Sequence, residues 1–203
     1  MQKSLFPIFY FPPVAWFSAL VKESSSVFFE QYETFPKQTY RNRTSIYAAN
    51  GKLSLMIPIQ HSGSRLMKDI QISDVENWRK QHWKSIESAY RGSPYFEFYE
   101  DKIKSIVFFE ERSLLNFNRN ALEVLFKILK IEIPFQLTND FETDFDGIDY
   151  RNQFSAKSKE EFGFPKYYQT FDEKFGFIEN LSILDVICNL GPESLAYLKQ
   201  IKS

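Results

Sequence analysis

The sequence predicts one α/β domain: a mixed sheet that contains an antiparallel hairpin, flanked by helices, with a helical part at the C-terminus. Two observations predict this fold class. Short runs typical of strands occupy much of the first sixty residues, and longer segments with helical periodicity follow them. The length of 203 residues suits a single domain with elaborations.

The first sixty residues contain the strand signals. Each run is rich in β-branched or aromatic residues, and proline, serine or glycine residues lie beside it. Asn50-Gly51 separates two of the runs and is typical of a type I′ hairpin turn, because both positions need a positive φ. The expected elements are a buried strand over 4–10, a helix over 14–21, a central strand over 27–32 and an antiparallel pair over 43–49 and 52–59.

Two long helices are expected in the middle of the chain. The first begins at Ser73, where Glu76 three residues later completes a capping box, and it ends before Gly92. The second covers 113–130 and has an apolar stripe at helical spacing. Both helices are therefore expected to pack one face against the sheet.

The last third of the chain combines a polar segment with short helices. The segment 139–166 is polar and shows neither helical nor strand periodicity, so we expect a mobile excursion there. Ser182 and Asp185 predict the start of a helix that ends at Gly191, and Pro192 starts a final short helix.

Composition excludes several classes of function. The 25 basic and 26 acidic residues give a net charge of −1, so we expect no nucleic-acid and no membrane partner. Seven widely spaced glycines exclude the dinucleotide fingerprint and the P-loop. One cysteine and two histidines allow neither an internal disulfide nor a Cys₄ or Cys₂His₂ zinc site. No metal and no cofactor are expected.

The apolar run from Leu5 to Val21 superficially resembles a signal peptide. Pro7, Pro12 and Pro13 interrupt the apolar helix that such a peptide needs, and the run is short for a membrane span. We therefore expect a cytoplasmic protein.

The densest polar cluster is 37–43, where a loop enters the predicted hairpin. Arginine forks and lysine point charges suit a phosphate or carboxylate, and the stretch 37–91 has ten basic against four acidic residues. Surface ion pairs on solvated faces fit the same pattern. Composition alone does not distinguish an anion-binding site from surface ion pairs.

The two histidines differ in their setting. His82 lies on the apolar face of a predicted helix, where a hydrogen-bonded core residue is the more common outcome and a general base is the alternative. His61 follows a predicted strand, and we expect it to be exposed and without function.

Several segments occur in an order that resembles one family. They are Phe9-Tyr-Phe-Pro-Pro-Val-Ala-Trp-Phe17, Lys37 with Tyr40 and Asn42-Arg43, Asn50-Gly51 with Ile57-Pro58, Lys68-Asp69-Ile70, Trp78 with Ser85-Ile86 and Ala89-Tyr90, Ser93-Pro-Tyr-Phe96, and Asn180-Leu-Ser-Ile-Leu-Asp185. The chain resembles the WbqC-like protein family over nearly its whole length, apart from 138–166. The resemblance implies one WbqC-like domain over 1–203.

The family name derives from bacterial surface-polysaccharide gene clusters. The resemblance therefore implies a role near O-antigen or nucleotide-sugar metabolism and a cytoplasmic location, but no particular reaction. In another branch of the family two acidic residues precede the motif lysine, whereas Gln31 and Tyr32 stand there in this chain. That difference counts against a mechanism that needs two carboxylates at those positions.

The resemblance also selects among the polar residues. Arg41 and His61 match the motifs less well, and the helix cap already explains Ser182 and Asp185. Because polar motif residues that are remote in sequence gain a common explanation by meeting at a ligand, we expect Lys37, Asn42 and Arg43 to line one concavity with Asn180 or His82. The predicted ligand-binding residues are Lys37, Tyr40, Asn42, Arg43, His82 and Asn180.

Two hypotheses follow. The first is an enzyme of surface-polysaccharide or nucleotide-sugar metabolism, a group transferase acting on a sugar or sugar-nucleotide, with an anionic small molecule such as a nucleotide-sugar as its partner. No catalytic residue is assigned, because no nucleophile and base pair is recognisable. The alternative is a non-catalytic binding or assembly protein with an aromatic-rich interface, since 18% of the residues are aromatic. The sequence indicates no oligomeric state.

Overall fold

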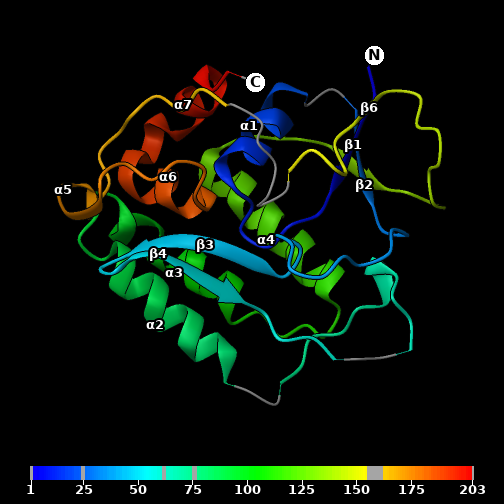
Figure 1. The fold of residues 1–203 in the computed structure, drawn as a ribbon, viewed down its shortest axis with the longest axis horizontal. Coiled ribbons are helices and arrows are strands. Elements are labelled where there is room, and N and C mark those ends of the chain that lie inside the picture. The colour runs from blue at the N-terminus through cyan, green and yellow to red at the C-terminus, as the bar shows by residue number, and fades with distance from the viewer. Residues whose placement is uncertain (1, 24–25, 61–62, 75–76, 155–161, 203) are drawn as a thin grey trace.

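Two separate sheets carry the fold, one parallel and one antiparallel. The structure is a computed structural model that describes residues 2–23, 26–60, 63–74, 77–154 and 162–202. The hairpin and the parallel sheet lie toward opposite ends of the molecule (Figure 1). In sheet order, the parallel strands are β5 (Phe135–Leu137), β2 (Val27–Glu30), β1 (Ser4–Pro7) and β6 (Ile148–Asp149), and the hairpin strands are β3 (Arg43–Ala48) and β4 (Gly51–Met56).

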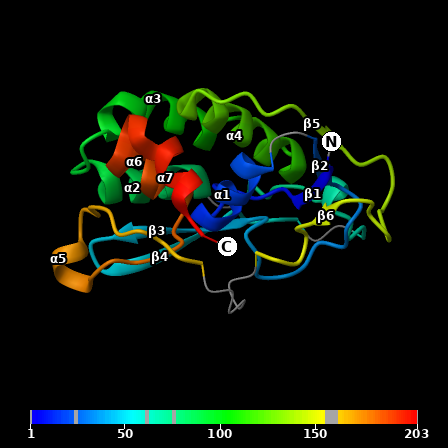
Figure 2. The ribbon, with the colours of Figure 1, turned by 90° about the horizontal axis from the view of Figure 1, so that it is seen from above.

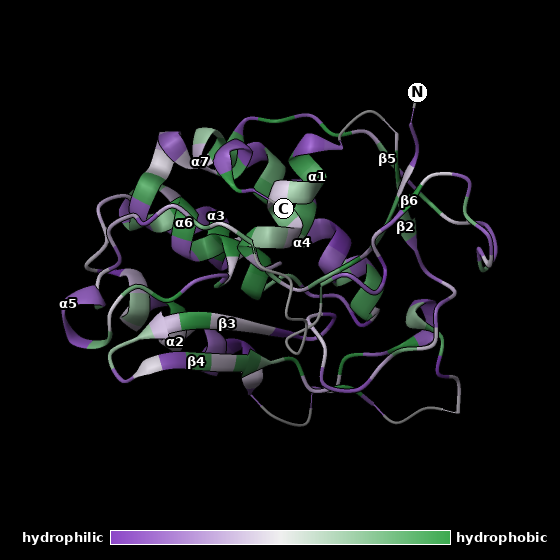
Figure 3. Cartoon of the chain, turned by 45° about the horizontal axis from the view of Figure 1, so that its top comes forward, coloured by the Kyte–Doolittle hydropathy of each residue, from purple (hydrophilic) through white to green (hydrophobic). Residues whose placement is uncertain are grey.

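Most helices lie on one side of the hairpin (Figure 2). Their bounds are α1 (Val14–Lys22), α2 (Trp78–Tyr90), α3 (Phe96–Val107), α4 (Leu114–Leu129), α5 (Asp172–Phe175), α6 (Ile183–Leu190) and α7 (Ser194–Gln200), with 3₁₀ turns η1 (Met67–Asp69) and η2 (Gly191–Glu193). The short helix α5 has no buried residue and is drawn in the hydrophilic colour at the edge of the molecule (Figure 3).

The first fifty residues explain the parallel arrangement. Strands β1 and β2 pair in parallel from Ser4 opposite Val27 to Pro7 opposite Glu30, and α1 connects them. A parallel pair needs such a crossover, because the chain must return to the same end of the sheet. Apolar side chains fill this unit on both faces, as expected for a covered parallel sheet.

Trp16 lies at the centre of the aromatic core. Its ring contacts Phe6, Phe9, Phe17 and Phe29 at centroid distances of 5.6 to 6.1 Å. Its indole N–H donates to the backbone oxygen of Pro7 at 3.1 Å, so the polar atom of this buried ring is satisfied. Part of the high aromatic content therefore fills the interior between α1 and the parallel strands.

The predicted hairpin is confirmed. Arg43 pairs with Met56 and Ala48 with Gly51, and Gly51 has a φ of 95°. The hairpin forms a sheet of its own, separate from the parallel strands, and α2 packs against β3. The fold class expected from the sequence is confirmed.

Several expected boundaries need correction. The predicted N-terminal strand ends at Pro7 rather than at residue 10, and Tyr10 N–H instead donates to the Tyr40 oxygen. The first long helix begins at Trp78 rather than at Ser73, and Asn77 precedes it as the N-cap residue. Glu76, the other half of the expected capping box, lies outside the described residues.

Two helices and two strands were not predicted, namely α3, α5, β5 and β6. Helix α3 follows Tyr95, and strand β5 follows α4. Strand β6 lies inside the segment 139–166 and pairs with β1, so this segment contains an ordered edge strand. Both unpredicted strands are short, with three and two residues, and local sequence gives little signal for strands of this length. Residues 155–161 of the segment lie outside the description.

Gly191 is expected to tolerate no side chain. It ends α6 with a φ of +52°, and a Cβ there would lie 2.4 Å from the Tyr95 ring. Gly191→Ala should therefore lower the free energy of unfolding by more than about 2 kcal/mol in urea denaturation. Gly176→Ala is the matched control, because its φ is +72° but no atom lies within 4 Å, and it should cost about 1 kcal/mol. Equal losses in the two variants would contradict the close contact.

Candidate functional site

A cavity of about 550 Å³ lies where the parallel strands end. Tyr32 and Glu33 follow β2, Phe141 follows β5, and Arg151 follows β6, so residues from three strand ends line it. Ligands of open α/β sheets bind beyond the carboxyl ends of the strands, because loops from neighbouring strands converge there. The lining consists of Tyr32, Glu33, Thr34, Pro36, Gln38, Thr39, Tyr40, Arg41, Phe141, Arg151, Asn152 and Phe154.

The carboxylate of Glu30 is buried beside the cavity, at the end of β2, and is 0% exposed. Its oxygens accept hydrogen bonds from the Tyr32 backbone N–H at 2.8 Å and from the Thr138 hydroxyl at 2.9 Å. They also accept from the Glu142 backbone N–H at 3.4 Å and from Arg151 Nη1 at 3.1 Å. Glu30 therefore joins the segments that follow β2, β5 and β6.

Glu33 and Arg41 form a two-pronged ion pair in the cavity wall. Arg41 Nε donates to Glu33 Oε1 at 2.6 Å, and Arg41 Nη2 donates to Glu33 Oε2. The two residues are only 7% and 4% exposed. Burial raises the pKa of the Glu33 carboxyl, while the hydrogen bonds from Arg41 act in the opposite direction. The pair also stands over the Phe9 ring, which lies 5.4 Å from the Arg41 guanidinium carbon.

Arg151 closes the other side of the cavity. Its Nε and Nη2 donate to the Asp149 carboxylate at 2.6 to 3.0 Å, and its Nη1 reaches Glu30. The hydrogen bonds from Arg151 lower the pKa of Asp149, and they outweigh the opposing effect of burial. The guanidinium carbon lies 5.0 Å from the Phe141 ring centroid, so an aromatic face covers this ion pair.

Comparison with known proteins identifies the family of this chain. A family model described as the WbqC-like protein family matches residues 9–160, which is most of the chain and includes the cavity lining. The chain belongs to the WbqC-like family. An uncharacterised protein of Mycobacterium tuberculosis, Rv1507c, is 23% identical over 94% of each chain. No solved structure matches.

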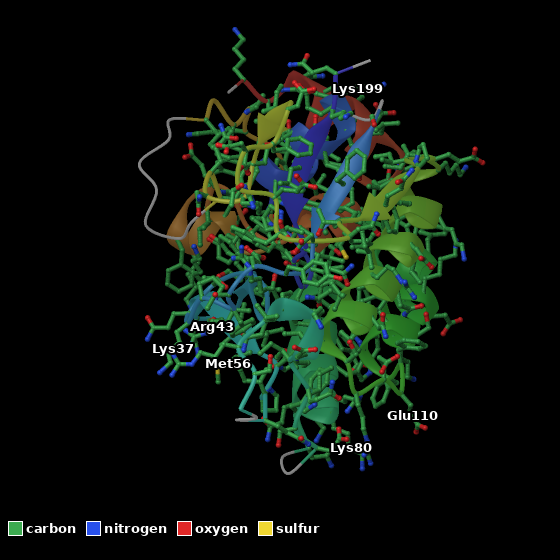
Figure 4. All side chains as sticks on the ribbon, turned by 90° about the vertical axis from the view of Figure 1, so that its right-hand side faces the viewer. Lys37, Arg43, Met56, Lys80, Glu110 and Lys199 are labelled. Carbon is green, nitrogen blue, oxygen red and sulfur yellow. The ribbon has the colours of Figure 1, made fainter. Side chains whose placement is uncertain are left out.

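The WbqC-like motif residues do not all meet at the cavity. Tyr40 lines it, and its ring packs against Phe9 at a centroid distance of 5.7 Å. Lys37 is exposed and lies between two lining residues, Pro36 and Gln38, so it stands at the rim. Arg43 is half-buried on β3 opposite Met56, and Figure 4 shows it on the same side of the molecule as Lys37.

The other three predicted site residues make structural hydrogen bonds instead. Asn42 donates to the Ile57 oxygen at 2.9 Å at the base of the hairpin. Asn180 has a φ of 52°, and its side-chain oxygen accepts from the Ala15 N–H at 2.9 Å, which caps the start of α1. The expected concavity shared by Lys37, Asn42 and Arg43 with Asn180 or His82 is therefore not found, and a ligand-binding role for these residues stays a prediction.

His82 is buried in the core, and its neighbours fix its protonation. The Met56 carbonyl lies 3.2 Å from Nε2 and can only accept, so Nε2 carries the hydrogen and Nδ1 accepts from the Tyr10 hydroxyl at 3.0 Å. Burial lowers the pKa of His82 to about 4. The side chain is therefore neutral near pH 7 and links α2 to β4. The other histidine, His61, lies outside the described residues.

Sequence reasoning missed the acidic residues and one arginine of this site. Glu30, Glu33 and Arg151 were not singled out, and Arg41 ranked below Arg43 on motif match. The sequence did contain one signal for Glu30, because this residue directly follows an apolar run typical of a strand. A charged residue at the end of a buried parallel strand is typical of a ligand-binding site. Glu30 and Arg151 are 121 positions apart in the sequence, so no local sequence pattern predicts that they pair.

Ser182 and Asp185 have different roles, although a shared helix cap was expected. Ser182 caps α6 by accepting from the Leu184 N–H at 3.3 Å. Asp185 is 1% exposed, and its carboxylate accepts from the Tyr167 hydroxyl at 2.6 Å and from the Gln169 amide at 2.8 Å. Asp185 therefore holds the segment before α5 against α6.

Among the residues that the structure describes, no helix has the length and apolar character that crossing a bilayer requires.

The ion pair in the cavity wall can be tested by stability. Glu33→Gln should lower the free energy of unfolding by about 3–5 kcal/mol in urea denaturation, because the Arg41 guanidinium stays buried without its counter-charge. The double variant Glu33→Gln/Arg41→Gln leaves no unpaired charge and should lose much less than the sum of the two single variants. Additive losses would show that the two side chains are not coupled.

The buried carboxylate in α6 predicts a pH dependence. Burial raises the pKa of Asp185 from 3.8 to about 6, so its contribution to stability is complete below about pH 4 and is lost as the pH rises through about 6. Asp185→Asn keeps an acceptor oxygen and does not titrate. The stability of the wild type relative to this variant should fall by about 2–3 kcal/mol between pH 4 and 7. A difference that is flat across this range would contradict the raised pKa.

Proposed function

We propose that this member of the WbqC-like family is an enzyme of bacterial surface-polysaccharide or nucleotide-sugar metabolism, a group transferase that binds a nucleotide-sugar at the cavity beyond the parallel strands. The position of the cavity carries the proposal, since loops from β2, β5 and β6 meet there and sheet edges of this kind bind ligands. Its volume of about 550 Å³ is within the usual range for small-molecule sites.

The lining supports a ligand with a ring and polar substituents. Aromatic side chains such as Tyr32, Tyr40 and Phe141 provide flat apolar surfaces, and Glu33 and Arg41 provide hydrogen-bond acceptors and donors between them. Lys37 at the rim offers a mobile positive charge to a phosphate outside the cavity. A nucleotide-sugar contains both kinds of group.

The alternative of a non-catalytic binding protein draws on exposed aromatic residues. Phe98 on α3 is 75% exposed, and Tyr168 is 54% exposed. These are individual exposed side chains, whereas the cavity brings aromatic side chains and the buried Glu33–Arg41 pair together in one hollow. The cavity is therefore the better-supported site.

Isothermal titration against UDP-glucose, UDP-N-acetylglucosamine, UDP-galactose, GDP-mannose and dTDP-glucose tests the proposal. At least one should bind to the wild type, and Lys37→Ala should weaken that binding about three- to tenfold by removing one charge near the phosphates. Lys52→Ala is the matched control, because Lys52 is also exposed but lies on β4, and the affinity of this variant for the same nucleotide-sugar should equal that of the wild type. Absence of binding across the whole panel would overturn the proposed function.

A further inference from the structure

The guanidinium groups of the cavity are already occupied by carboxylates. Arg41 directs its Nε and Nη2 edge at Glu33, and Arg151 directs its Nε and Nη2 edge at Asp149 and its Nη1 at Glu30. Phosphate recognition by arginine uses these same two-pronged edges. A phosphate entering the cavity would have to displace a buried carboxylate from its partner.

The charge around the cavity also disfavours a phosphate. Among the described residues of this ion-pair network, three carboxylates (Glu30, Glu33 and Asp149) face two guanidiniums. With all five groups ionised, the network carries one negative charge. Because Glu30 and Glu33 are buried, water screens their charges poorly, and a dianionic group would be repelled.

The Glu33–Arg41 pair keeps hydrogen-bonding capacity for a neutral ligand. Each Glu33 oxygen accepts one N–H from Arg41, and a carboxylate oxygen can accept a second hydrogen bond. Arg41 Nη1 donates to none of the residues that the structure describes. The pair therefore presents acceptors and donors side by side, which matches neighbouring hydroxyl groups on a ring.

Aromatic side chains line the same cavity as this pair. Tyr32 lies one position before Glu33 and Tyr40 one position before Arg41, and both line the cavity together with Phe141. The C–H faces of a pyranose ring pack against such aromatic surfaces while its hydroxyls bond to a polar wall. Resting on the proposed function, we propose that the cavity takes the sugar ring of the nucleotide-sugar, held by Glu33 and Arg41, while the phosphates stay outside at the rim.

The test compares a nucleotide-sugar with its bare nucleoside diphosphate. For each panel member that binds, titration of the wild type should show at least tenfold tighter binding than of the matching nucleoside diphosphate, UDP, GDP or dTDP. Glu33→Gln/Arg41→Gln should lose this preference and keep its affinity for the nucleoside diphosphate. Tyr32→Ala should reduce the preference, and Tyr168→Ala, an exposed tyrosine outside the cavity lining, should leave it unchanged. Thermal melting of each variant establishes that it is folded before titration.

The outcomes separate the two proposals. Equal loss of nucleotide-sugar and nucleoside diphosphate binding in the folded double variant would place the phosphates in the cavity and overturn this inference, while the proposed function stands. If no panel member binds, the proposed function fails. In that case, saturation-transfer NMR with methyl glucoside, methyl galactoside and methyl mannoside tests the sugar-ring site by itself. Saturation transfer to a glycoside that is present in the wild type and absent in the double variant would support the site. No transfer in the wild type would overturn it.

Discussion

The arrangement of the site depends on one buried carboxylate. Glu30 ends β2 without any exposure to solvent, and its oxygens are hydrogen-bonded by groups that follow β2, β5 and β6. A buried charge without partners would be costly, so the chain can close this edge only when Thr138 and Arg151 are both in place. Because burying Glu30 without partners would be costly, its hydrogen bonds fix the positions of the segments that follow β2, β5 and β6 around the cavity.

The sequence predicted those parts of the fold that local patterns determine. The Asn50-Gly51 turn, the first helix after Pro13 and the start of α4 next to Ser113 all depend on neighbouring residues, and the structure confirms them. Strand β6 could not be predicted in this way, because it has two residues and exists only by pairing with β1, more than 140 positions earlier. Local propensity has little influence where the partner strand supplies the stability.

The candidate site was only partly predictable for a related reason. Tyr40 was selected and lines the cavity, whereas Asn42 and Asn180 proved to bond to backbone groups. A polar residue in a motif has two common explanations, a ligand or an otherwise unsatisfied backbone group, and sequence alone does not separate them. Arg41 shows the converse, since the motif match ranked it low and the fold places it in the cavity wall.

Arg41 is held in place from several directions. Its guanidinium is paired with Glu33 and stands over Phe9, and its backbone oxygen accepts from the Asn118 side chain at 2.7 Å. The rotational freedom of this long side chain is therefore lost when the protein folds, not when a ligand arrives. Binding at such a preorganised wall avoids an entropic penalty of about 0.5–1.5 kcal/mol for each side chain that would otherwise be immobilised. Even a small ligand with few contacts can then be held in a single orientation.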